Sequence, residues 1–127
     1  MKYPADLLYT KDHEWIRIED DGASATVGVT DFAQDELGDV VFVELQPPGS
    51  EIARDEPFGA VEAVKTVSDV YMPLSGRILE INEELEAHPD YVNTDPYGKG
   101  WMIRIALADG AETGELLSSD DYERMTG

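Results

Sequence analysis

The segment from Gly59 to Gly76 constrains the fold most strongly, because its composition is that of two β-strands meeting at a tight bend. Val, Ala and Thr dominate the runs on both sides of Lys65, and such residues suit a pleated, half-buried surface. Phe58 precedes the first run, and Pro73 stands near the end of the second. The sequence therefore predicts a β-hairpin with Lys65 exposed at its bend, where its amine is accessible to a modifying enzyme.

Short strand-like runs separated by turn residues continue through the rest of the chain. The predicted strands cover residues 15–18, 23–29, 40–45, 76–81 and 101–106. The run 40–45 is almost continuously apolar, which predicts a strand covered on both faces. This pattern indicates an all-β sandwich or barrel with minor helices.

Three helical segments are expected. The first spans residues 30–38, with Thr30 or Asp31 as its N-cap and Gly38 as its stop. A helical turn is predicted near 83–86, followed by a long loop to residue 100. The chain ends in a short helix, for which Ser118 or Ser119 is the expected cap.

The charge balance excludes two classes of partner. The chain has 28 Asp and Glu residues against 9 Lys and Arg residues, which gives a formal net charge of -19. Such a charge repels the phosphates of nucleic acids and anionic membrane surfaces. We therefore expect neither a nucleic acid nor a membrane as a partner.

Length and composition predict one cytoplasmic domain. Residues 1–127 are expected to form a single domain, and the chain is expected to be a monomer. No apolar run approaches the roughly 20 residues needed to cross a bilayer, and the first residues lack a signal-peptide pattern. The absence of cysteine fits a reducing compartment and means that any redox chemistry must come from an attached group.

Catalysis by the chain alone has few candidate residues. Of the two histidines, His88 lies in a loop without triad or metal-ligand spacing. His13 and Glu14 directly precede Trp15, and this trio either lines a cleft or forms the entry of a strand. The sequence has no Gly-rich phosphate loop and no two-histidine zinc motif.

A set of residues spread over nearly the whole chain matches the pattern of one known family: Tyr9, His13-Glu14-Trp15, residues 27–34, residues 37–45, Gly59-Ala60-Val61-Glu62, Val64-Lys65, Pro73, Ser75-Gly76, Val92-Asn93, Pro96-Tyr97, Gly100-Trp101, Leu116-Leu117 and Tyr122. On these residues the chain resembles the H-protein family of the glycine cleavage system. It implies a mainly β fold: a lipoyl/biotinyl-type barrel-sandwich hybrid of two small antiparallel sheets with short peripheral helices, one of them C-terminal.

The resemblance also implies roles for individual residues. The family's lipoylated lysine falls on Lys65, so the implied cofactor is covalently attached lipoate. The family positions that present this lysine to the lipoate-attaching enzyme fall on Glu62, Gly49 and Gly76.

The resemblance also implies a cleft for the arm formed by the lysine side chain and its lipoyl group. In the family the loaded arm folds back so that the amino group it carries meets acidic side chains, and these positions fall on Glu14 and Asp69. The chain departs from the family pattern at Asp12 and Ala63, which are often serine, and in the insertion of Gln46 after the central strand.

The implied function is that of a carrier without catalytic activity of its own. Through lipoate on Lys65, the chain would take the aminomethyl group of glycine from glycine decarboxylase to the aminomethyltransferase, and then pass electrons to dihydrolipoamide dehydrogenase. Three alternatives stay open: a lipoate-relay carrier; the lipoyl domain of a 2-oxo acid dehydrogenase complex or a related biotinyl domain; and a small hydrolase that uses Glu14 and Asp69. The triplet Val64-Lys65-Thr66 differs from the Asp-Lys-Ala and Met-Lys-Met that are usual in lipoyl and biotinyl domains.

Overall fold

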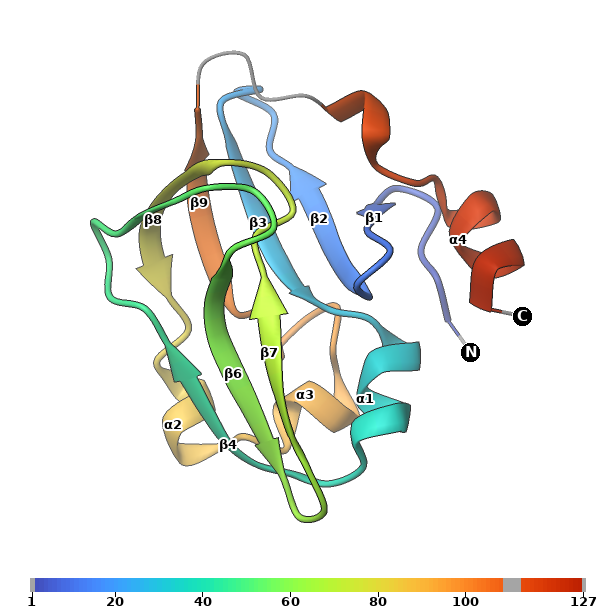
Figure 1. Ribbon diagram of the computed structural model, residues 1–127, viewed down its shortest axis with the longest axis vertical. Helices are drawn as coiled ribbons and strands as arrows, with labels where there is room; N and C mark the ends of the chain where they lie inside the picture. The colour runs from blue at the N-terminus through green and yellow to red at the C-terminus, as the bar shows by residue number, and fades with distance from the viewer. Residues whose placement is uncertain (1, 109–112, 127) are drawn as a thin grey trace.

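The computed structural model describes residues 2–108 and 113–126, and most of these residues belong to β-strands and their connections (Figure 1). The strands are β1 (Leu8–Tyr9), β2 (Glu14–Ile18), β3 (Ser24–Val29), β4 (Val40–Leu45), β5 (Glu51–Ile52), β6 (Pro57–Ala63), β7 (Val67–Tyr71), β8 (Gly76–Ile81) and β9 (Ile103–Leu107). They form a six-stranded sheet in the order β1-β2-β3-β9-β8-β5 and a three-stranded sheet in the order β4-β6-β7.

The pairing of the strands confirms a mainly β fold of two antiparallel sheets. Every pair of neighbouring strands is antiparallel. Within the described ranges no strand pair joins one sheet to the other, so the architecture is a sandwich without a closed barrel. The main core lies between the two inner faces, where side chains such as Val27, Val61 and Ile105 are fully buried.

The helices are short and lie at the edges of the sheets (Figure 1). They are α1 (Asp31–Leu37), α2 (Glu84–Ala87), α3 (Tyr91–Thr94) and α4 (Ser119–Thr126), with a 3-10 turn at Thr113–Glu115. Of the two N-cap candidates for α1, Thr30 is the cap, because its hydroxyl accepts a hydrogen bond from the backbone N–H of Ala33. Gly38 ends α1 with a φ of 78°. Ser118 caps α4 by accepting from the N–H of Asp121.

Three predictions about local structure are corrected. The prediction that residues 40–45 are covered on both faces is wrong, because β4 is an edge strand of the smaller sheet and only its inner face is buried. A β-bulge between Val40 and Phe42 turns two successive apolar residues outward, leaving Val41 51% and Phe42 47% exposed. The predicted loop after residue 86 contains the unpredicted helix α3, and the last predicted strand begins at Ile103, after Trp101.

A second, aromatic core lies between the six-stranded sheet and the C-terminal helix. The rings of Tyr9 and Tyr122 stack with their centroids 4.8 Å apart, and both side chains are fully buried. Trp15 is also buried here, and its indole Nε1 donates a hydrogen bond to the carbonyl of Pro96. Gly28 lies opposite Trp15, where a Cβ would come within 2.7 Å of the indole nitrogen. Only glycine therefore fits at position 28.

Candidate functional site

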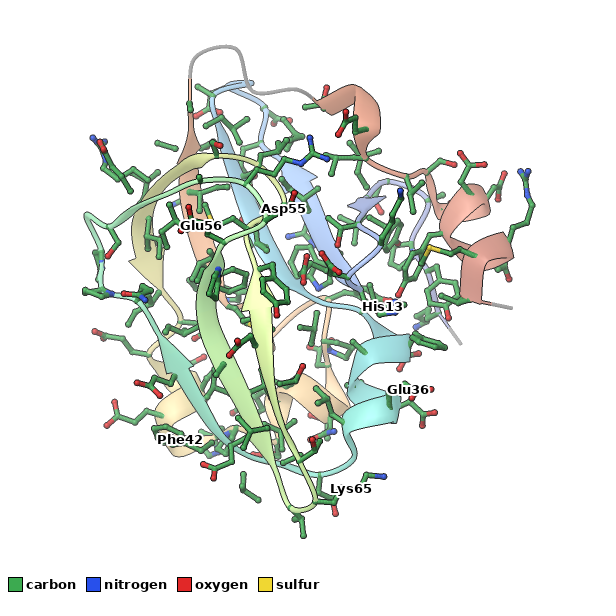
Figure 2. All side chains as sticks on the ribbon, viewed as in Figure 1. His13, Glu36, Phe42, Asp55, Glu56 and Lys65 are labelled. Carbon is green, nitrogen blue, oxygen red and sulfur yellow. The ribbon has the colours of Figure 1, made fainter. Side chains whose placement is uncertain are left out.

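Lys65 lies in the turn between β6 and β7, at one end of the three-stranded sheet (Figure 2). The turn is closed by a hydrogen bond from the N–H of Ala63 to the carbonyl of Thr66. A second bond, from the N–H of Val64 to the carbonyl of Asp39, ties the turn to the segment that follows α1. The backbone of the bend is thus fixed at two points while the lysine side chain is exposed.

The stem of Lys65 passes close to the end of helix α1. A Cβ built on Gly38 would lie 3.4 Å from Cε of Lys65, and the φ of 78° at Gly38 is one that glycine adopts readily. Leu37, the last residue of α1, lines a cleft that begins beside this contact. The exposed lysine side chain therefore passes beside Gly38, the residue that directly follows the cleft residue Leu37.

This cleft has a volume of about 270 Å³ and runs between α1 and β7. Its lining residues are Asp12, His13, Val29, Phe32, Ala33, Glu36, Leu37, Ser68, Asp69 and Val70. Half of these are apolar, and the polar half includes three carboxylates. The lining can therefore contact an apolar chain along its length and pair with a cationic group at its end.

His13 is the most constrained residue of the cleft. Its φ of 69° lies in the left-handed region, which few residues other than glycine adopt. Its Nδ1 lies 2.8 Å from the hydroxyl of Tyr122, and its ring centroid lies 4.7 Å from that of Phe32. Burial lowers the pKa of His13, although the nearby carboxylates of Asp12 and Glu36 act in the opposite direction.

Glu14 follows His13 but does not line the cleft. Only 1% of Glu14 is exposed, and its carboxylate accepts hydrogen bonds from the hydroxyl of Thr10 and the backbone N–H of Tyr71. Burial raises its pKa to about 7 despite these two bonds. Asp69 lines the cleft with Asp12 and Glu36, whereas Glu14 lies outside this lining and links β2 to β7. That Glu14 and Asp69 together receive the amine of the loaded arm stays a prediction.

Glu62 lies apart from Gly49 and Gly76, the other two residues expected to present Lys65 for lipoylation. Glu62 lies three residues before Lys65, exposed on the outer face of β6. Gly76 begins β8, which follows the end of β7 that lies away from the lysine turn, and the N–H of Gly49 donates a hydrogen bond to the carbonyl of Ile78 in β8. A Cβ on Gly76 would clash with the carbonyl oxygen of Ala106, and Gly49 has a φ of 92°. Both glycines thus shape the backbone at a distance from the lysine.

Comparison with known proteins identifies the family. The profile of the family described as glycine cleavage H-protein matches residues 7–127. The chain belongs to this family. It is 58% identical over 126 residues to the glycine cleavage system H protein of Salinibacter ruber, which covers 99% of this chain and 100% of that one. The corresponding protein of Prosthecochloris aestuarii is 54% identical over 127 residues, covering 100% and 99% of the two chains.

A solved structure agrees with this assignment. The crystal structure of a glycine cleavage system H protein from Mycobacterium marinum superposes with a TM-score of 0.89 at 40% identity, covering 98% of this chain and 99% of that one. Glycine cleavage H-proteins carry lipoate covalently on a lysine and serve as carrier subunits, not as catalytic enzymes. In the part of the chain that the structure describes, no helix has the length and apolar character to cross a membrane.

The cleft contains residues that the sequence analysis did not assign to a site. Phe32 and Glu36 are four residues apart on α1, as are Ala33 and Leu37, so one side of this helix faces the cleft. That spacing could have placed Glu36 in the site once the helix was predicted. Nothing in the sequence could have placed Tyr122 against His13, because 109 residues separate them.

Proposed function

We propose that Lys65 is the residue of this glycine cleavage H-protein that carries lipoate, and that residues 1–127 form a single carrier domain. The observation that carries the proposal is the position of Lys65: it is exposed at a turn whose backbone is fixed, beside a cleft with apolar and acidic lining. The lining suits a group that is an apolar chain with a polar end. When bound, lipoate would supply a dithiolane whose S–S bond is reduced as it takes up the aminomethyl group of glycine, so that after transfer of this group a dithiol is left to pass two electrons to the dehydrogenase.

The chain's own residues determine how this group is delivered. The fixed turn holds the backbone of Lys65, and the side chain supplies a flexible four-carbon stem. A tethered group meets its next site at an effective concentration of order mM. We infer that the partners are glycine decarboxylase, the aminomethyltransferase, dihydrolipoamide dehydrogenase and the lipoate-attaching enzyme, met by the chain as a monomer in the cytoplasm.

The cleft has a protective role in this proposal. Asp12, Glu36 and Asp69 would pair with an ammonium group brought into it, while the apolar wall at Phe32 and Leu37 keeps water from that group. Glu14 would support this wall by holding β2 against β7. Glu62, Gly49 and Gly76 are proposed to present Lys65 for modification, the two glycines by shaping the backbone.

The substitution Lys65→Arg tests the proposal. Arginine keeps the positive charge of the turn but cannot form the amide, so a lipoate–protein ligase supplied with lipoate and ATP should leave this variant unmodified. The wild-type chain should gain the mass of one lipoyl group, and its formal charge should move from -19 to -20. Intact-mass measurement and a native gel report both changes.

Lys11→Arg is the matched control, because Lys11 is also exposed but lies before β2. This variant should be lipoylated at the wild-type rate and should support glycine cleavage with the three partner enzymes. A Lys65→Arg chain that still supported glycine cleavage would disprove the assignment. A wild-type chain that is lipoylated but inactive in glycine cleavage would favour the lipoate-relay alternative.

A further inference from the structure

Exposed apolar side chains gather at the end of the three-stranded sheet that carries Lys65. Six large apolar side chains are exposed among the described residues, namely Val41, Phe42, Val64, Val67, Leu79 and Met125. Of these, Val41 and Phe42 lie in β4, Val64 lies in the lysine turn and Val67 begins β7. Scattered exposed apolar residues are normal, but a group of four beside one functional residue indicates a contact surface.

Strand register arranges part of this group as a row. Phe42 of β4 is paired with Glu62 of β6, and Glu62 is paired with Val67 of β7. Directly paired residues of antiparallel strands point to the same face, and neighbouring strands are about 4.8 Å apart, so the row is about 10 Å wide. Phe42 is 47% and Val67 62% exposed. We call the row Phe42, Glu62 and Val67 the hairpin-end face.

Apart from Lys65, the charged residues around the hairpin-end face are acidic. Glu44 and Asp69 belong to the next row of the same outer surface, since both pair with Ala60. Lys65 is the only Lys or Arg in β4, β6, β7 and the turn between β6 and β7. When the side chain of Lys65 lies in the active site of a partner enzyme, the rest of the contact surface around it is apolar and acidic. Its complement is a partner surface with apolar sockets and basic residues.

We propose that the hairpin-end face is the docking surface for the lipoate-attaching enzyme, an inference that rests on Lys65 being the attachment site. This enzyme must bring its reactive centre to the Nζ of the unmodified lysine, only four carbons from the backbone. Its surface must then lie against the strands on both sides of the turn. Enzymes that act at the end of the finished arm work farther from these strands.

The contacts follow from the geometry of the row. Phe42 and Val67 occupy apolar sockets on either side of the lysine channel, and a Lys or Arg of the enzyme pairs with Glu62 between them. Phe42 lies in β4, which is separated from β7 by β6. The enzyme therefore recognises residues of all three strands of the sheet, and not only those adjacent to Lys65 in sequence. An isolated hairpin peptide would lack this recognition surface.

The test compares lipoylation kinetics of Phe42→Thr and Val67→Thr with those of Leu79→Thr. Threonine keeps the strand preference of each position while removing apolar contact, and Leu79 is an exposed apolar residue of β8 in the other sheet. Initial rates with a lipoate–protein ligase, lipoate and ATP are followed by intact mass over a range of chain concentrations. In this reaction the lipoate carboxylate forms an amide with Nζ, the ammonium loses two of its three protons, and ATP is cleaved to pyrophosphate and AMP, which keeps the oxygen that leaves the carboxylate.

Phe42→Thr and Val67→Thr should each raise the KM for the unmodified chain about tenfold or more and leave kcat within about twofold. Leu79→Thr should change neither value by more than about twofold. Glu62→Gln should raise KM at low salt and weaken its dependence on sodium chloride. Thermal melting of each variant confirms that the fold is retained.

Unchanged KM in both folded variants, with Lys65 lipoylated normally, would overturn the docking face and leave the proposed function intact. Lipoylation of the wild-type chain at another lysine would instead overturn the proposed function. The finished carriers give a second readout: variants lipoylated to completion should keep their KM for glycine decarboxylase within about twofold. A loss with the decarboxylase and none with the ligase would overturn the proposal, because the face would then serve the decarboxylase.

Discussion

At the scale of single residues, the carboxyl group of Glu14 is almost completely buried. Its pKa of about 7 compares with an ordinary value of 4.5. Below pH 4.5 the group is protonated in both the folded and the unfolded chain. As pH rises toward 7, the unfolded chain releases the proton first, so the free energy of unfolding falls by about 1.4 kcal/mol per pH unit from this group alone.

Glu14→Gln should remove this dependence, because an amide does not titrate. The free energy of unfolding of the variant minus that of the wild type should therefore increase by about 2 kcal/mol between pH 5 and pH 7, and level off above. Urea denaturation at a series of pH values measures the difference. A constant difference for Glu14→Gln would contradict the raised pKa.

At the scale of secondary-structure elements, helix α4 connects the end of the chain to the cleft. The hydroxyl of Tyr122 lies 2.8 Å from Nδ1 of His13 and 2.7 Å from the hydroxyl of Thr30, the N-cap of α1. Tyr122→Phe keeps the stacked ring but leaves both partners without this hydrogen bond. The variant should lose about 1 to 3 kcal/mol of unfolding free energy.

Tyr91→Phe is the matched control for α4. The hydroxyl of Tyr91 makes no hydrogen bond within the described residues, so its removal should change the unfolding free energy by less than about 0.5 kcal/mol. Urea denaturation at neutral pH compares the two variants. Equal stabilities would show that the hydroxyl of Tyr122 does not connect α4 to the cleft in solution.

At the scale of the whole molecule, excess negative charge opposes folding. The 19 excess charges share 6725 Å² of accessible surface, about 350 Å² each. Their mean spacing of about 19 Å exceeds two Debye lengths at physiological salt. Local clusters such as Glu83, Glu84 and Glu86 lie much closer together. Arg54, Arg104 and Arg124 pair with Glu115, Glu80 and Asp121, away from this cluster.

The melting temperature should therefore rise as sodium chloride increases from about 0.1 M to 1 M, where the Debye length falls to roughly 3 Å. Replacing Glu83 and Glu86 by Gln should reduce the slope, because these exposed carboxylates belong to one cluster. A melting temperature that stays flat or falls across this range would show that the surface charge does not limit stability.

Local patterns predicted most elements because the residues involved act on their immediate neighbours. Thr30 and Gly38 delimit α1 through bonds and backbone angles within that helix. The hairpin around Lys65 follows from its flanking β-branched runs. The exposure of Val41 and Phe42 could not be predicted from the sequence, because an apolar run does not reveal whether its strand lies at the edge of a sheet. Helix α3 has only four residues, too few for a helical period.

Residue types within short segments predicted a mainly β fold and the position of Lys65 in a turn, and the resemblance over nearly the whole chain implied the family and its two sheets. Which groups surround the lysine depends on the tertiary structure. It placed Glu36 and Asp69 across one cleft, buried Glu14 behind His13, and aligned Phe42 with Glu62 and Val67. These arrangements depend on strand register and on the packing of α1 against the sheets, which bring together residues that are distant in the chain.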